Sequence, residues 1–232
     1  IIWADIVLAH PEVLDAIPRY VTMLDWDYFT GAERVPQILV WGGRDLGHSI
    51  RVTWPEFQEA AKGPKAALFA AVRQHAVDDQ TRRDGTFRGF YCTDLLRAAG
   101  FEVLTGSASR CSGDMVGVPL HERHIPNVFH FARKGFASGM GHLVTSWAVR
   151  HNHPEVGLPA VYAAPFALRA EDPLDLDALG RAFTKDFYGV EMPEFIGAVM
   201  KAQPTFGSLC QAAPLHDVRR AVERGENPLP KH

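Results

Sequence analysis

The run from Phe90 to Ser109, FYCTDLLRAAGFEVLTGSAS, decides the fold class of this chain. Its first part, through Ala99, predicts a helix, which Gly100 ends because glycine is the usual residue just past a helix. Phe101–Thr105 then predicts a strand, and the small, polar residues 106–109 predict the loop that follows it. Helices that alternate with strands in this way build parallel α/β sheets.

The same rhythm appears on both sides of this unit. Strands are predicted over residues 1–7, 21–24 and 142–147, and helices from His10 onward, around 125–136 and over 158–168. Four strands, each followed by a helix, predict parallel pairing in chain order with helices on the outer face. Four such units make half of an eight-stranded barrel, or a small open sheet. No glycine-rich nucleotide fingerprint follows any strand, which disfavours a dinucleotide-binding fold.

Two segments depart from this rhythm. Residues 32–86 combine a strand at 38–41, a helical stretch over 54–75 broken at Gly63-Pro64, and a polar loop at 78–85, and they predict a long insertion. An apolar stripe over 176–187 and a further helix at 195–200 precede a polar tail at 225–232. We therefore expect a half barrel over 1–190, with an insertion at about 32–86, and a helical extension over 191–232.

Composition narrows the classes of function. The chain has 232 residues, is 47% hydrophobic and 22% charged, and carries a formal net charge of −3, as an ordinary globular domain does. Lysines and arginines are scattered, so no nucleic-acid partner is expected, and no run approaches the about 20 apolar residues of a membrane helix. Cys92, Cys111 and Cys210 match neither a disulfide framework nor a zinc motif, and they fit a reducing, cytoplasmic compartment.

The histidine pairs do not change this expectation. His121 and His124 lie three residues apart, not the four of the helical zinc motif, and His151-Asn152-His153 precedes a proline in a loop. We expect no metal and no cofactor.

Polar and aromatic residues follow three of the four strands. In a (β/α) barrel those strand ends form the active-site face. Tryptophan offers a flat apolar surface to the C–H face of a sugar ring, while carboxylates and phenols hydrogen-bond its hydroxyls. Any single tryptophan is more often core filling, but three strand ends of the same character favour a sugar site. The expected substrate-binding residues are Asp5, Trp26, Asp27, Tyr28 and Trp147.

These strand ends resemble glycoside hydrolase family 20, most closely the branch that contains hexosaminidase D and similar bacterial N-acetylhexosaminidases. The resemblance covers residues 1–31 and 88–190. Its motifs are Trp3-Ala4-Asp5-Ile6 with His10-Pro11-Glu12, Leu24-Asp25-Trp26-Asp27-Tyr28, Gly100-Phe101-Glu102-Val103 with Gly106-Ser107-Ala108, and Gly141-His142-Leu143-Val144-Thr145-Ser146-Trp147. Residues 183–189 are similar to the helical tail of these enzymes.

The resemblance implies a retaining exo-β-N-acetylhexosaminidase that uses substrate-assisted catalysis, an exception to the two-carboxylate scheme. Tyr28 or Asp27 would hold the acetamido group or a hydroxyl, Trp147 would form a wall, and Asp5 and Trp26 would support it. The family's catalytic Asp-Glu dipeptide has no counterpart in this sequence. We expect it upstream of Ile1, because the chain opens without methionine in what reads as the middle of a strand.

Two other interpretations stay open. In one, the chain is a non-catalytic carbohydrate-binding relative of these enzymes; in the other, it is a small open-sheet α/β protein with no sugar role. The expected partner is a saccharide with a terminal N-acetylhexosamine. A half barrel exposes strand edges and apolar surface, so its own missing N-terminal half or a second copy is a further expected partner.

Overall fold

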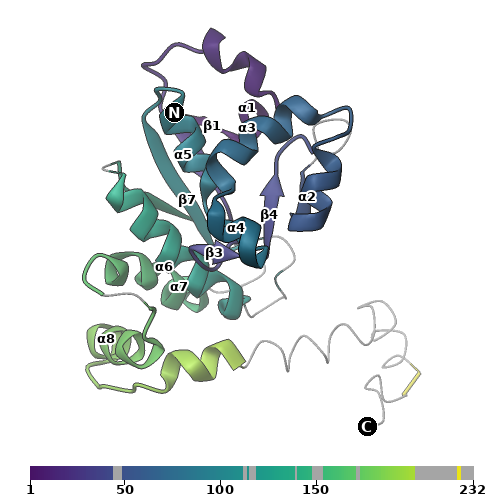
Figure 1. Cartoon of the computed structure of the whole chain (residues 1–232). Coiled ribbons are helices and arrows are strands. Elements are labelled where there is room, and N and C mark those ends of the chain that lie inside the picture. The colour runs from purple at the N-terminus through teal and green to yellow at the C-terminus, as the bar shows by residue number, and fades with distance from the viewer. Residues whose placement is uncertain are drawn as a thin grey trace.

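The structure, a computed structural model, describes residues 1–43, 49–111, 114, 119–138, 140–147, 154–170, 173–201 and 224–225. Within these residues the chain is an α/β protein built on one parallel sheet (Figure 1). Cys210, the 151–153 loop and most of the 225–232 tail lie outside the described residues.

The central sheet has four parallel strands: β1 (Ile2–Trp3), β2 (Met23–Trp26), β7 (Val103–Arg110) and β8 (His142–Ser146). Their spatial order is β1-β2-β7-β8, which is also chain order. The predicted parallel, sequential sheet is therefore confirmed.

Two predicted boundaries were wrong. The first strand ends at Trp3, and Asp5 begins helix α1 (Asp5–Ala9), which buries Val7 and Leu8. A short apolar run does not by itself distinguish strand from helix. Residues 106–109, expected as a loop, continue β7. Their small side chains allow close packing there: a Cβ at Gly106 would lie 3.1 Å from Leu24 Cδ1.

Helices cover one face of this sheet, which we call the helix face. They are the 3₁₀ helix η1 (Pro11–Ala16), α5 (Tyr91–Ala98), α6 (His121–Ala137) and α7 (Leu158–Ala167). Ile125, Phe129 and Ala132 are fully buried, as their spacing predicts. On the sheet side, Asp25 accepts a hydrogen bond from Thr93 of α5, and Thr105 donates to the Phe131 carbonyl of α6.

Between β2 and α5, the residues that the structure describes form two small antiparallel pairs and three helices. The pairs are β3 (Arg34–Val35) with β6 (Phe87–Arg88) and β4 (Gln37–Val40) with β5 (Ile50–Thr53). The helices are α2 (Trp54–Ala60), α3 (Ala66–Ala76) and α4 (Asp79–Asp84). The predicted helical stretch with its break at 63–64 is thus present.

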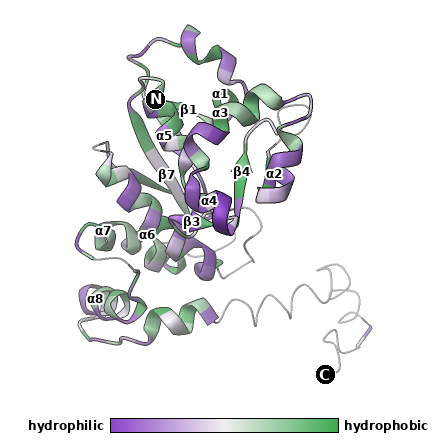
Figure 2. Cartoon of the chain, in the orientation of Figure 1, coloured by the Kyte–Doolittle hydropathy of each residue, from purple (hydrophilic) through white to green (hydrophobic). Residues whose placement is uncertain are grey.

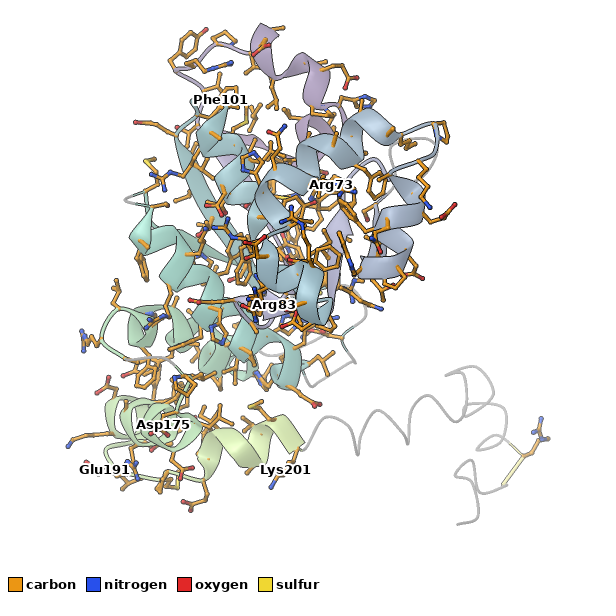
Figure 3. All side chains as sticks on the ribbon, viewed as in Figure 1. Arg73, Arg83, Phe101, Asp175, Glu191 and Lys201 are labelled. Atoms are coloured by element: carbon orange, nitrogen blue, oxygen red, sulfur yellow. The ribbon has the colours of Figure 1, made fainter. Side chains whose placement is uncertain are left out.

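The expected loop at 78–85 is instead helix α4. Asp78 caps it by accepting from the Thr81 N–H at 2.9 Å, and Gly85 ends it in the left-handed region at φ 78°. Nearby, Phe57 packs against Phe69 and Phe87, and Arg73 lies over Phe57 at 5.5 Å (Figure 3). Phe57, Phe69 and Phe87 belong to the same buried core as Met23 and Val103 of the sheet. In Figure 2, β4 is largely the green of apolar residues, whereas α2 and α4 are largely purple.

The C-terminal part adds η4 (Pro154–Gly157), α8 (Leu176–Tyr188) and a helix over 195–201. Of the predicted apolar stripe on α8, Leu179 and Phe183 are buried, whereas Phe187 remains 46% exposed. Asp175 caps the helix, as expected for an acid at a helix start (Figure 3). Among the described residues, no helix is both long and apolar enough to cross a membrane.

Candidate functional site

Aromatic side chains from three strand ends meet in a closed ring at the carboxyl edge of the sheet. Trp3 lies 6.3 Å from Trp26 and 5.8 Å from Trp147 between ring centroids, and Trp26 lies 4.7 Å from Tyr28. The indole N–H of Trp147 donates to the Tyr28 hydroxyl at 2.9 Å and closes the circle. We call these four residues the aromatic ring.

The members of the aromatic ring differ in exposure. Trp3 is 41% and Trp147 is 44% exposed, whereas Tyr28 is only 7% exposed. Burial raises the pKa of the Tyr28 hydroxyl, and hydrogen bonding with Thr145 and Trp147 opposes the rise. The aromatic ring thus leaves parts of two indoles exposed to solvent. Beside them lies the largely buried, neutral hydroxyl of Tyr28, which can donate a hydrogen bond.

The two predicted carboxylates take different positions. Asp5 begins α1 at the same edge of the sheet, and its charge contributes to the raised pKa of Tyr28. Asp27 is occupied by a local turn, because it accepts from the N–H groups of Phe29 and Thr30 at 2.7 and 2.9 Å and from the Thr30 hydroxyl. Asp27 therefore shapes the loop that carries Tyr28.

Two tryptophans of this edge were absent from the predicted set. Trp3 belongs to the family motif but was not among the expected substrate-binding residues, although its ring contacts those of Trp26 and Trp147. Trp41 directly follows β4 and lies 4.6 Å from Trp26. The apolar run that ends at Trp41 was visible in the sequence, but it belongs to the 32–86 segment, whose strand end was not counted with the others.

Asp25 has a raised pKa, as many catalytic acids do, but its side chain lies away from the aromatic ring. Burial raises its pKa from 3.8 to about 7, while the 2.6 Å hydrogen bond from Thr93 opposes the rise. Successive side chains of a strand point to opposite faces. Since Trp26 points to the aromatic ring, Asp25 points to the helix face and cannot reach a ligand held by the ring.

Donor atoms able to hold a metal ion lie beside the aromatic ring. Cys111, which packs in one small cluster with Tyr28, Trp26 and Ala108, stands with Asp114 and His124 so that their ligand atoms lie within 4.8 Å of one another. Nearby His121 is also buried, which lowers its pKa to about 4.

Comparison of this chain with family models, with curated proteins and with solved structures found no match. The features that bear on function are therefore those of the structure itself: a sheet of four parallel strands and the aromatic ring at the carboxyl ends of those strands.

Proposed function

We propose that this chain is the sugar-binding part of a β-N-acetylhexosaminidase barrel of the family 20 type. The observation that carries the proposal is the aromatic ring, with the indoles of Trp3 and Trp147 exposed at the carboxyl ends of parallel strands. That edge is where (β/α) barrels bind their substrates. Folding favours burial of large apolar side chains, so two partly exposed tryptophans in contact suit a ligand surface.

The barrel form is supported by the way the sheet's edges approach each other. β1 and β8 are its opposite edges. Three steps of ~4.8 Å would separate them by roughly 14 Å in a flat sheet. Trp3 lies in β1 and Trp147 follows β8, yet their ring centroids are 5.8 Å apart. The two long side chains lean toward each other across the sheet, and a sheet that curls toward a barrel would favour this approach.

The groups around the ring suit an N-acetylated sugar. Indole faces pack on the C–H side of a pyranose, and the Tyr28 hydroxyl and the Asp5 carboxylate can hydrogen-bond its acetamido and hydroxyl groups. We assign Trp147 and Trp3 to the walls, Trp26 and Tyr28 to the floor, and Asp27 to the turn that holds Tyr28.

Hydrolysis requires more than this chain supplies. In the proposed mechanism the acetamido oxygen attacks the anomeric carbon while a glutamate protonates the leaving oxygen. No Asp-Glu dipeptide occurs in the sequence, and neither Asp25 nor Asp27 can replace it from where it lies. We therefore propose that the chain by itself binds the sugar without cleaving it, and that the acid comes from a strand preceding β1.

The second candidate is a non-catalytic carbohydrate-binding relative. It is favoured by the same engagement of Asp25 and Asp27 in structural hydrogen bonds. Reading the codons upstream of Ile1 separates the two candidates: an Asp-Glu pair after a strand-like run supports the enzyme, and its absence supports the binding protein.

Calorimetric titration with N-acetylglucosamine tests sugar binding itself. We expect measurable binding, weaker binding of glucose, and a loss of about tenfold or more in Trp147→Ala, an effect of about 1.4 kcal/mol. Trp54→Phe is the matched control, because Trp54 packs on Phe57 away from the ring. If the control loses affinity as much as Trp147→Ala does, or if neither sugar binds, the proposed sugar site is wrong.

A further inference from the structure

A cation already stands among three potential metal ligands next to the aromatic ring. Nη2 of Arg123 lies 3.0 Å from the Cys111 sulfur, 2.6 Å from an Asp114 oxygen and 3.2 Å from Nε2 of His124. The side chains of Asp114 and His124 are fully buried and Cys111 is 4% exposed. Thiol, carboxylate and imidazole groups therefore surround one position that is shielded from water.

The Nε2 atom of His124 faces both a hydrogen-bond donor and an acceptor. Its Nε2 lies 2.8 Å from Asp114 as well as 3.2 Å from the guanidinium nitrogen. A proton on Nε2 serves the carboxylate but faces a second N–H donor. A proton on Nδ1 leaves a lone pair against a carboxylate oxygen, and an imidazolium sets two cations together.

The other nitrogen of the same imidazole also lacks a partner. Nδ1 of His124 is buried and makes no hydrogen bond, at a cost typical of unmet buried polar groups. A metal ion would remove the conflict at Nε2. With the proton on Nδ1, the lone pair of Nε2 and the carboxylate of Asp114 would both point at the ion. The two electron-rich groups would then no longer face each other directly.

Arg123 is more exposed than the three donors that it contacts. Its side chain is 20% exposed, its Nε is buried without a partner, and its guanidinium carbon lies 5.3 Å from the Phe29 ring. Guanidinium groups stack favourably on aromatic faces. The guanidinium therefore already rests on the Phe29 ring, and this contact can hold it when Nη2 withdraws from the three donors.

We propose that Cys111, Asp114 and His124 form a binding site for a divalent transition metal of the zinc class, and that the guanidinium of Arg123 and this ion are alternative occupants. Mixed sulfur, nitrogen and oxygen donors select such borderline ions over magnesium or calcium. Three protein ligands leave one position for water. Binding displaces the thiol proton of Cys111 to solvent, so metal affinity rises with pH.

The ion would join three separate pieces of the chain. Cys111 follows β7, Asp114 lies in the loop beyond it, and His124 lies in the first turns of α6. Because Cys111 packs in the same cluster as Tyr28, the ion would fix the support of the aromatic ring. The site does not depend on the proposed sugar chemistry, and either can fail alone.

Cobalt reports on the site directly. The full chain, stripped of metal and carrying no affinity tag, is titrated with Co²⁺ alone. We expect a thiolate-to-cobalt charge-transfer band that saturates at one equivalent, disappears in Cys111→Ser and persists in Cys92→Ser. Cys92 is the matched control because it is also buried but lies on α5 in a different cluster. No band in the unmodified chain, or a band that survives Cys111→Ser, overturns the proposal.

Replacing Arg123 tests whether its guanidinium and the metal ion compete for the same position. Arg123→Met leaves a similar apolar stem and should bind Co²⁺ roughly tenfold more tightly, the scale on which groups around a metal site act. Equal or weaker binding means that Arg123 and the ion do not compete. A further measurement needs no variant: excess Zn²⁺, but not Mg²⁺, should raise the thermal unfolding midpoint of the unmodified chain. A midpoint that zinc leaves unchanged refutes the site.

Discussion

The two faces of the central sheet invert the usual distribution of polar and apolar residues. On the helix face, Asp25, Thr105 and Ser107 are at most 1% exposed. On the opposite face, which bears the aromatic ring, Trp3, Leu143 and Trp147 are 41%, 42% and 44% exposed. Buried polar groups and exposed large apolar groups are the informative departures from average burial.

The polar residues of the helix face are explained by their hydrogen bonds. His142 contacts the hydroxyl of Thr105 through Nδ1 and that of Ser107 through Nε2, both at 2.7 Å. Burial lowers the pKa of His142 to about 3, so the ring is neutral and uses both nitrogens in structure. Among the described residues, Trp3 and Trp147 contact other aromatic side chains of the aromatic face and still remain partly exposed. The buried hydrogen bonds of the helix face stabilise the fold. The partly exposed tryptophans make the opposite face the better candidate for binding a ligand.

Asp25→Asn should remove the pH dependence of folding stability that Asp25 contributes on the helix face, and this is the largest effect that we expect. The folded-state pKa is raised to about 7, so the folded chain holds this proton more tightly than the unfolded chain between about pH 4 and pH 7. Native stability should therefore fall as pH rises through that window, by about 4 kcal/mol from this group. The amide keeps the Thr93 hydrogen bond and carries no charge. Urea unfolding at about pH 4 and about pH 8 should show the variant gaining relative stability with pH; parallel curves would contradict the assignment.

Gly135→Ala should show how tightly α6 is seated on the helix face. A Cβ at Gly135 would meet the Thr105 hydroxyl oxygen and, at 2.5 Å, the carbonyl oxygen of Gly141. Overpacking of this kind costs roughly 1–3 kcal/mol or more. Gly197→Ala, where a Cβ meets nothing within 4 Å, is the control and should be neutral or stabilising. Similar melting temperatures for both variants would show that α6 is not held at this distance.

Trp147→Ala should separate binding from stability on the aromatic face. Because the side chain is 44% exposed, its removal should cost under about 2 kcal/mol of unfolding free energy. The same change should remove most of the sugar affinity if the proposed function holds. A large loss of stability, measured by urea unfolding, would place Trp147 in the core instead.

Tyr28→Phe should give the smallest effect. The change removes the acceptor of the Trp147 indole N–H, a neutral hydrogen bond worth about 1 kcal/mol. Since Trp147 is partly exposed, water can replace the lost acceptor. Sugar affinity should fall only a few-fold, and the Trp147→Ala, Tyr28→Phe double variant should show non-additive effects. Full additivity would mean that the two residues act separately.

The sequence predicts the sheet well because its signals are local. Strand-helix rhythm gives the order of β1, β2, β7 and β8, and helical spacing gives the buried face at Ile125 and Phe129. It fails at residues 106–109, whose small, polar side chains are typical of loops. They lie in β7 because neighbouring elements approach closely: a Cβ at Gly157 would come within 3.3 Å of the Ser109 hydroxyl oxygen.

The candidate sites were predicted less completely because they join distant segments. Trp26, Tyr28 and Trp147 follow strands and were visible as strand ends. Trp41 comes from the segment that interrupts the rhythm. The donors at 111, 114 and 124 have no motif spacing, and they meet only when the chain after β7 turns back onto α6.

The closeness of the indoles has an optical consequence. Transition dipoles of neighbouring aromatic rings couple more strongly as the distance between them falls, and Trp26 lies 4.6 Å from Trp41 and 6.3 Å from Trp3, which lies 5.8 Å from Trp147. Four of the chain's five tryptophans therefore form one chromophore with a shared near-ultraviolet circular dichroism signal. Any event that tilts one ring should change this shared signal, so a rearrangement of the four tryptophans can be followed in solution without an added label.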